Sequence, residues 1–139
     1  MIKKLICLGF ILALVACSTG NTDDSKTGVS FEILPIESAI VPSSFSLNQT
    51  YQIRVLYYRP SNCHAFSEFY FEKQGSERVV AIINSVIDNI NCEALDNDLI
   101  EVLFNFVAED SGTYLFKFWQ GFDQNGNDQY YIVEVPVLN

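Results

Sequence analysis

Few residues of this chain have the type and spacing that covalent catalysis requires. Its only histidine, His64, directly follows Cys63. A hydrolytic triad needs a histidine placed between a nucleophile and a carboxylate, and a histidine beside an oxidised cysteine is a poor base. Any acid-rich chain supplies carboxylate pairs, so the paired carboxylates of a glycosidase stay open. The residues favour a protein that is not an enzyme, and they indicate no cofactor.

Two cysteines have the separation expected of a disulfide. Cys7 and Cys17 lie near the amino terminus, which leaves Cys63 and Cys92 as a pair. A bridge between them would close a loop of about thirty residues and stabilise the fold by about 3 to 4 kcal/mol in the chain-entropy model. The alternative is a metal site, but structural zinc normally needs four ligands. We therefore predict a Cys63–Cys92 disulfide and no metal.

Calcium is the other metal to consider, because five aspartates fall in connections between apolar segments: Asp88, Asp96, Asp98, Asp123 and Asp128. Calcium takes six to eight oxygen ligands. The stretch DQNGND has its glycine in fourth place, whereas the EF-hand loop has glycine in sixth place. This mismatch makes a calcium-dependent adhesin the third of our functional hypotheses.

The elements that would position these residues are short and rich in Val, Ile, Phe and Tyr, which is typical of antiparallel all-β domains. We expect one domain over 29–139, built as a seven-stranded antiparallel sandwich. The predicted strands cover residues 29–35, 49–58, 65–73, 78–87, 99–107, 112–121 and 129–138.

The last hairpin can be predicted residue by residue. Asn125-Gly126 is the favoured pair for a two-residue type I′ turn. Residues whose numbers sum to 251 would then face each other. One face would pair apolar residues, namely Tyr114 with Val137, Phe116 with Val135 and Phe118 with Val133. The other would pair Lys117 with Glu134, so both faces would carry favourable cross-strand pairs.

The outward face of this hairpin is a candidate binding face. In the predicted register Leu115 and Trp119 point away from the core, Ile132 faces Trp119 and Tyr130 faces Gly121. Tyr70 on an earlier strand joins them. Such a cluster often marks a contact surface for a glycan, a protein or a second copy. The alternatives are that an N-terminal strand covers it or that Trp119 packs over a glycine.

A second candidate surface lies in the loops. Asn62 to His64, the connection DNINCEALDND and the hairpin tip FDQNGND would meet at one end of an up-and-down sandwich, where the disulfide pins two of them. Recognition loops are commonly carried by a rigid scaffold in this way. The alternative is stapling for stability alone.

The stretch DSGTYLF, Asp110 to Phe116, resembles the immunoglobulin motif DxGxYxC. The resemblance implies that Tyr114 makes a tyrosine corner and that Phe116 occupies the cysteine position, opposite an apolar residue such as Val55. Both core cysteines and the strand C tryptophan are absent, with Phe69 or Phe71 as substitutes. This indicates an immunoglobulin-like sandwich and excludes an antibody-like domain.

The first sixteen residues, MIKKLICLGFILALVA, are typical of a secretory signal peptide. Leu14 to Cys17 resembles the lipobox of bacterial lipoproteins, which implies cleavage before Cys17 and its lipidation. The polar residues 17–28 would form a flexible tether, and Asp23-Asp24 in it resembles the export patch of Bacteroidota lipoproteins. We therefore expect a membrane partner through the lipid anchor, in the cell envelope and on the outer membrane, with the side of the membrane undetermined.

Charge narrows the partners further. The full chain has eight basic and seventeen acidic side chains. Removing the signal peptide takes away Lys3 and Lys4, so six basic against seventeen acidic side chains give −11. Such a surface repels nucleic acid. The sequence predicts a non-catalytic binding protein for a glycan, peptide or protein, or alternatively a self-associating or complex-forming subunit of the envelope, with the oligomeric state undetermined.

Overall fold

The computed structural model describes residues 28–88 and 91–138. The predicted signal peptide, Cys17 and nearly all of the tether lie outside these residues. Within them the chain forms strands, and no helix there is long and apolar enough to cross a membrane. The strands are β1 (Val29–Leu34), β2 (Ser38–Ile40), β3 (Phe45–Ser46), β4 (Thr50–Tyr58), β5 (His64–Gln74), β6 (Glu77–Ile87), β7 (Leu99–Val107), β8 (Thr113–Phe122) and β9 (Asp128–Leu138).

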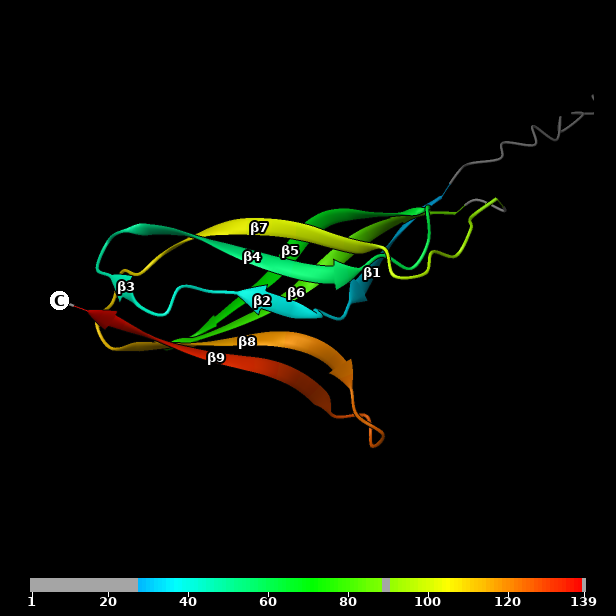
Figure 1. The fold of residues 1–139 in the computed structure, drawn as a ribbon. Helices are drawn as coiled ribbons and strands as arrows, with labels where there is room; N and C mark the ends of the chain where they lie inside the picture. The colour runs from blue at the N-terminus through cyan, green and yellow to red at the C-terminus, as the bar shows by residue number, and fades with distance from the viewer. Residues whose placement is uncertain (1–27, 89–90, 139) are drawn as a thin grey trace, which may run out of the picture.

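These strands form two facing sheets, so the fold is all-β and sandwich-like (Figure 1). The larger sheet has the order β1-β6-β8-β9-β3, with β5 also paired to β6, and the smaller sheet has the order β2-β4-β7. The seven predicted strands match β1 and β4 to β9 with each end within one residue. The predicted strand number is wrong for the described residues, because β2 and β3 are too short to give an alternating pattern.

The prediction that all strands pair antiparallel is also wrong. β6 pairs parallel with β8 through residues 77–80, and β3 pairs parallel with β9. β5 pairs along one edge of β6. The other edge of β6 is divided between β8 and β1, and β1 pairs with residues 82–87 of β6. In the immunoglobulin arrangement strands C and F belong to one sheet without strand D between them. Here β6 lies between β5 and β8, so the strand order differs.

The core follows from the alternation of side chains along each strand. Ile53, Val55 and Tyr57 on β4 are fully buried, as are Phe116 and Phe118 on β8. Burying one such side chain contributes about 1.5 to 3 kcal/mol. Successive residues of a strand point to opposite faces, so this inward row leaves Lys117 and Trp119 on the outer face of the larger sheet.

Phe116 packs where the immunoglobulin motif has its cysteine. Its ring contacts Phe106 and Phe45, with centroids 5.0 and 6.1 Å apart, and stacks on Phe118. Val55 is buried in the same cluster. Of the residues expected to replace the tryptophan, Phe69 packs against this core, whereas Phe71 remains about half exposed.

Tyr114 is held by contacts to its hydroxyl and to the face of its ring. Its hydroxyl accepts a hydrogen bond from the backbone N–H of Asp110 at 2.9 Å, which is the backward contact of a tyrosine corner. The buried Arg78 guanidinium lies 4.9 Å from the ring centroid and donates to the carbonyls of Gly75 and Glu77. A cation over an aromatic face is favourable when both are desolvated.

The predicted register of the last hairpin is wrong by two residues. Tyr114 pairs with Val135 and Trp119 with Tyr130, so the facing numbers sum to 249. A type I′ turn needs positive φ at both central residues, but at this turn only Gly126 has it, at 81°. Instead Asp123 Oδ1 accepts hydrogen bonds from the N–H groups of Asn125 and Asn127. This longer loop and a bulge after Trp119 shift the pairing.

The shift changes the partners of three outward residues. Lys117 pairs in register with Ile132, and its ammonium lies near Glu77 at 3.7 Å rather than near the predicted Glu134. Ile132 therefore does not face Trp119. A shift of two residues keeps every side chain on its predicted face, because the side-chain period of a strand is two.

Candidate functional site

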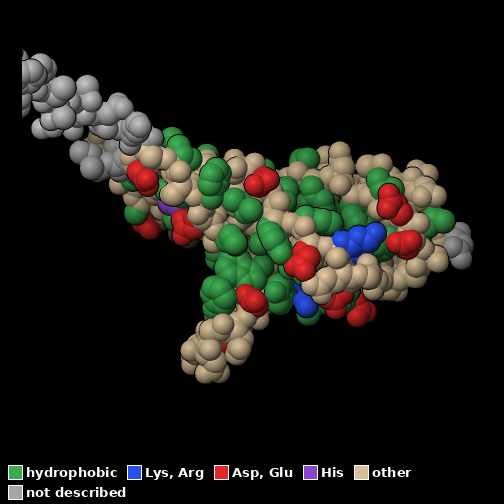
Figure 2. All heavy atoms as spheres, turned by 180° about the vertical axis from the view of Figure 1, so that it is seen from behind, with side chains coloured by type: hydrophobic (Ala, Val, Ile, Leu, Met, Phe, Trp, Pro, Cys, Tyr) green, Lys and Arg blue, Asp and Glu red, His purple; other side chains and the backbone are tan. Residues whose placement is uncertain are grey.

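The outer face of the larger sheet carries a pocket of about 350 Å³. It lies where β1 and β8 separate along β6, beside Ala81. Ligand pockets commonly measure about 300 to 1,000 Å³, so this one is at the small end. Its lining residues are Ile33, Tyr70, Glu72, Gln74, Val79, Ala81, Lys117, Trp119, Phe122, Asp128 and Tyr130. Viewed from behind, hydrophobic side chains gather at the base of the protruding β8–β9 hairpin (Figure 2).

Trp119 is fixed in this pocket by contacts within the hairpin. Its indole Nε1 donates a hydrogen bond of 2.8 Å to Asp128 Oδ1, and its ring meets Phe122 edge-on with centroids 5.3 Å apart. Tyr130 is its cross-strand neighbour. Trp119 is only partly buried and Phe122 is 67% exposed, so the aromatic side of the pocket meets solvent.

The opposite wall comes from β5, where one carboxylate collects two donors. Glu72 accepts a hydrogen bond of 2.7 Å from the Tyr70 hydroxyl and another from the side-chain amide of Gln74. The Tyr70 hydrogen bond, followed by that of Gln74, lowers the pKa of Glu72 below its usual value. The same hydrogen bond raises the pKa of Tyr70. Glu72 therefore stays ionised near neutral pH.

Lys117 is the only cation in the pocket lining. Its ammonium lies 4.8 Å from the centre of the Tyr130 ring and 3.7 Å from Glu77 Oε2. The Glu77 carboxylate thus balances the charge of Lys117. Glu72 and Asp128 remain as the other charged groups of the lining, so the pocket has an overall negative character.

Three of the five residues predicted for the binding face line this pocket, namely Trp119, Tyr130 and Tyr70. Leu115 and Ile132 lie on the same face but outside the lining. Glu72, Gln74, Lys117 and Asp128 were not predicted for this face, although Asp128 was considered as a calcium ligand. Glu72 and Lys117 lie two residues from a predicted aromatic residue and therefore share its face, which is a signal that could have identified them.

The predicted disulfide is confirmed. Cys63 and Cys92 are bonded, with Cα atoms 5.5 Å apart. The bridge joins the turn before β5 to the connection after β6. Backbone hydrogen bonds from Asn62 to Glu93 and from Leu95 to Pro60 add to it. We call residues 59–64 and 91–98 the pinned end. It lies beside the start of β1 (Figure 1).

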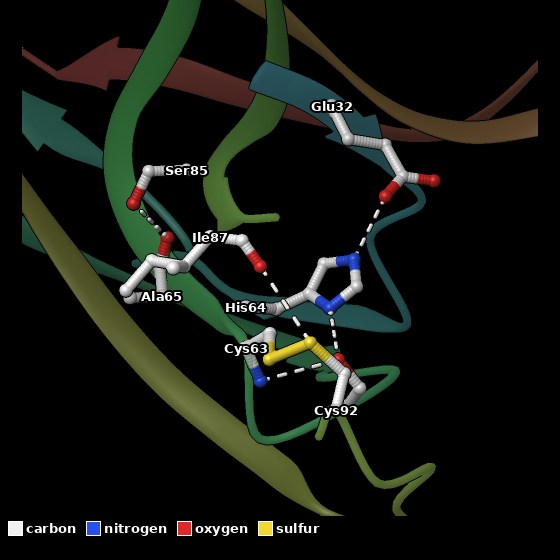
Figure 3. Close-up of polar contacts among 8 residues, drawn as sticks. Glu32, Cys63, His64, Ala65, Ser85, Ile87 and Cys92 are labelled. Carbon is white, nitrogen blue, oxygen red and sulfur yellow. Dashed lines mark hydrogen bonds and ion pairs between the residues drawn. A yellow bond between two sulfur atoms is a disulfide. The ribbon is translucent and has the colours of Figure 1, made fainter. Parts of the chain in front are cut away.

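His64 at this pinned end lies between a hydroxyl and a carboxylate, which the sequence did not predict (Figure 3). Its Nδ1 is 2.7 Å from Ser61 Oγ and its Nε2 is 2.8 Å from Glu32 Oε2. A carboxylate accepts only, so Nε2 carries the proton and, in the neutral ring, Nδ1 accepts from the serine hydroxyl. This is the chemical order of a hydrolytic triad.

Acyl transfer also needs free N–H groups that stabilise an oxyanion. The N–H groups of the three residues that follow Ser61 are already used. That of Cys63 donates to Ser61 Oγ itself, that of His64 to the Ser61 carbonyl, and that of Asn62 to the Glu93 carbonyl. The contacts of His64 with Ser61 and Glu32 therefore fasten β1 to the pinned end.

The aspartates considered for calcium are dispersed over different contacts. Asp98 pairs with Arg59, Asp123 closes its own turn, and Asp128 accepts from Trp119. Among residues 28–88 and 91–138 no group of three or more His, Cys, Asp or Glu could hold a metal ion.

Comparison with known proteins gave no match: no family model, no curated protein and no solved structure is significantly similar to this chain.

Proposed function

We propose that this protein is a lipid-anchored binding module of the cell envelope and that it holds its ligand in the pocket on the outer face of the larger sheet. One observation carries the proposal. Trp119, Tyr130 and Tyr70, from three different strands, converge with charged side chains in one pocket of ligand-binding size. Small-molecule sites combine apolar walls with a few placed polar groups in this way.

The envelope part of the proposal is supported by the sequence. The apolar amino-terminal segment and the lipobox-like LVAC support lipidation at Cys17, and two or three acyl chains would anchor a protein firmly. The immunoglobulin-like assignment is limited to the motif around Tyr114, where the hydrogen bond from Asp110 supports it, because the strand order differs. A short tether would keep the pocket close to the membrane that carries it.

Trp119 is the only tryptophan of the whole chain, so its fluorescence reports on the pocket directly. We expect the full-length protein, purified in mild detergent, to show emission that iodide quenches. A panel of envelope glycans and peptides should contain a ligand that shifts this emission and protects it from iodide. Emission that iodide does not affect, with no response to any member of the panel, would contradict the proposal.

Tyr130→Ala should weaken binding of that ligand about tenfold or more, because truncating an aromatic residue at the centre of a binding site that acts as a hot spot costs about 2 kcal/mol or more. Tyr58→Ala is the matched control, since Tyr58 is an exposed tyrosine on the smaller sheet. Both variants should melt within a few degrees of the wild type. Equal ligand affinity in the Tyr130 variant would show that the pocket is not the site.

The second candidate function is a self-associating or complex-forming subunit. One observation favours it: Val29, Phe31 and Ile33 on β1 are each more than half exposed, and Ile33 reaches the pocket. Contiguous exposed apolar side chains often mark protein contacts. Light scattering should then show a mass that rises with concentration, and Phe31→Ser should abolish the rise. A monomer mass that does not change with concentration would contradict self-association and leave the binding module as the proposed function.

A further inference from the structure

We infer that the ligand of the outer-face pocket is a neutral saccharide. This inference rests on the proposed function and concerns what the pocket selects. It is argued from the charges of the lining, from the hydrogen-bonding capacity that its side chains leave unused, and from the rings that form its apolar side.

The charges argue against both kinds of ion. Glu72 and Asp128 face the pocket as carboxylates, and Glu77 lies next to Lys117. An anionic group would therefore meet repulsion from at least two acids in a protein with a strong excess of negative charge. A cation would find these carboxylates, but the Lys117 ammonium, 4.8 Å from the centre of the Tyr130 ring, would repel it from the aromatic side of the pocket. A neutral ligand avoids both conflicts.

The donors of the lining are largely directed at its own carboxylates. The Trp119 N–H is used on Asp128, and the Tyr70 hydroxyl and the Gln74 amide are used on Glu72. Each carboxylate has about four acceptor sites, so lone pairs remain on both residues in fixed orientations. The pocket thus offers mainly acceptors, and its ligand has to supply donors.

A sugar ring supplies what this lining lacks. Its hydroxyls donate to carboxylates and also accept from an ammonium such as that of Lys117. Its C–H faces are apolar and suit the rings of Trp119, Tyr130 and Phe122. A pocket of about 350 Å³ suits about one or two sugar rings. A peptide also carries donors, but it pairs each one with a carbonyl acceptor, and the lining has few free donors to satisfy them.

The test is a fluorescence titration of Trp119 in the full-length protein. The neutral probes are mono- and disaccharides of glucose, galactose, mannose and N-acetylglucosamine, with glucuronate and glucosamine as charged matches. We expect at least one neutral sugar to shift and protect the emission, with its charged match binding at least about tenfold more weakly. Binding of glucuronate or of glucosamine as tight as that of its neutral match, or tighter, would overturn the inference.

Two conservative variants test the role of charge. Glu72→Gln and Asp128→Asn keep the shape and an acceptor oxygen but remove the negative charge. Each variant should weaken binding of the neutral sugar several-fold and reduce the difference in affinity between the neutral sugar and glucuronate. Glu101→Gln, an acid on the smaller sheet, is the control and should change neither value. If both pocket variants bind the neutral sugar with unchanged affinity, and the affinity difference to glucuronate is also unchanged, the charge argument is overturned.

The outcomes also separate this inference from the proposed function. If no saccharide binds while a peptide from the envelope panel protects Trp119 from iodide, the saccharide inference fails and the pocket remains a binding site. If neither binds and iodide does not reach Trp119, the proposed function fails together with the inference.

Discussion

The outer-face pocket and the disulfide-pinned end share the strands β1, β5 and β6 but are held by different kinds of contact. At the pinned end a covalent bond, several backbone hydrogen bonds and the Ser61–His64–Glu32 contacts join β1, β5 and the loop before β7. In the pocket the contacts are between side chains at the surface of β5, β8 and β9.

This difference separates stability from recognition. The disulfide reduces the freedom of the unfolded chain, and backbone hydrogen bonds order the native loops. Exposed side-chain contacts, in contrast, contribute little to the free energy of unfolding. Side chains that are not needed for folding can be selected for a ligand. Changes at the pinned end should therefore alter stability, and changes in the pocket should alter binding.

The largest expected effect comes from the core that both regions share. Phe116→Ala removes a fully buried ring that contacts Phe45, Phe106 and Phe118. Such truncations cost about 3 to 5 kcal/mol. Urea unfolding should show this loss, and Trp119 emission should become more quenchable because β8 is loosened. Phe116→Leu should lose clearly less. Equal stability of the Ala variant and the wild type would contradict the packing described for the core.

The disulfide should give the next largest effect and separate the two regions. Replacing Cys63 and Cys92 together by alanine opens a loop with a sequence separation of 29 residues. We expect a loss of about 3 to 4 kcal/mol in urea unfolding. The Trp119 fluorescence of the folded protein should stay the same, because the pocket lies outside the pinned end. A changed pocket emission at low urea would show that the two regions are coupled.

The smallest effect concerns the ionisation of Glu72. Tyr70→Phe removes the hydrogen bond that lowers its pKa, so the pKa of Glu72 should rise toward its usual value. A depressed pKa stabilises the fold above the unfolded pKa, and this contribution is lost as the pH falls through the folded pKa. The variant should therefore lose a little stability at neutral pH and depend less on pH in the acid range.

A carboxyl NMR titration would measure this shift directly. Tyr58→Phe, on the other sheet, should leave the pKa of Glu72 unchanged. An identical pKa in the wild type and in the Tyr70 variant would mean that the hydroxyl does not hold the carboxylate in solution.

The sequence was most informative about local features. The alternation of apolar and polar residues located seven strands with each end within one residue. It also separated inward from outward residues on β8 even though the predicted register was wrong, because a shift of two residues preserves the face. Two cysteines remaining as a pair were enough to predict the disulfide.

The register itself depended on a side chain that the turn signal does not include. Asn125-Gly126 favours a two-residue turn, but the Asp123 carboxylate collects the N–H groups of Asn125 and Asn127 and stabilises a longer loop. Such competition between a side chain and the backbone is common at turns. Its outcome cannot be deduced from the dipeptide alone.

The sequence by itself determined the seven longer strands, the faces they present and the cysteine pair, since these follow from periods of two and from residue types. The tertiary structure alone decided that β6 shares one edge between β1 and β8, which opens the pocket beside Ala81. It also decided that Glu32, thirty-two residues before His64, completes the contacts of that histidine. Strand order and contacts between distant segments depend on the packing of the whole core, and no local pattern encodes them.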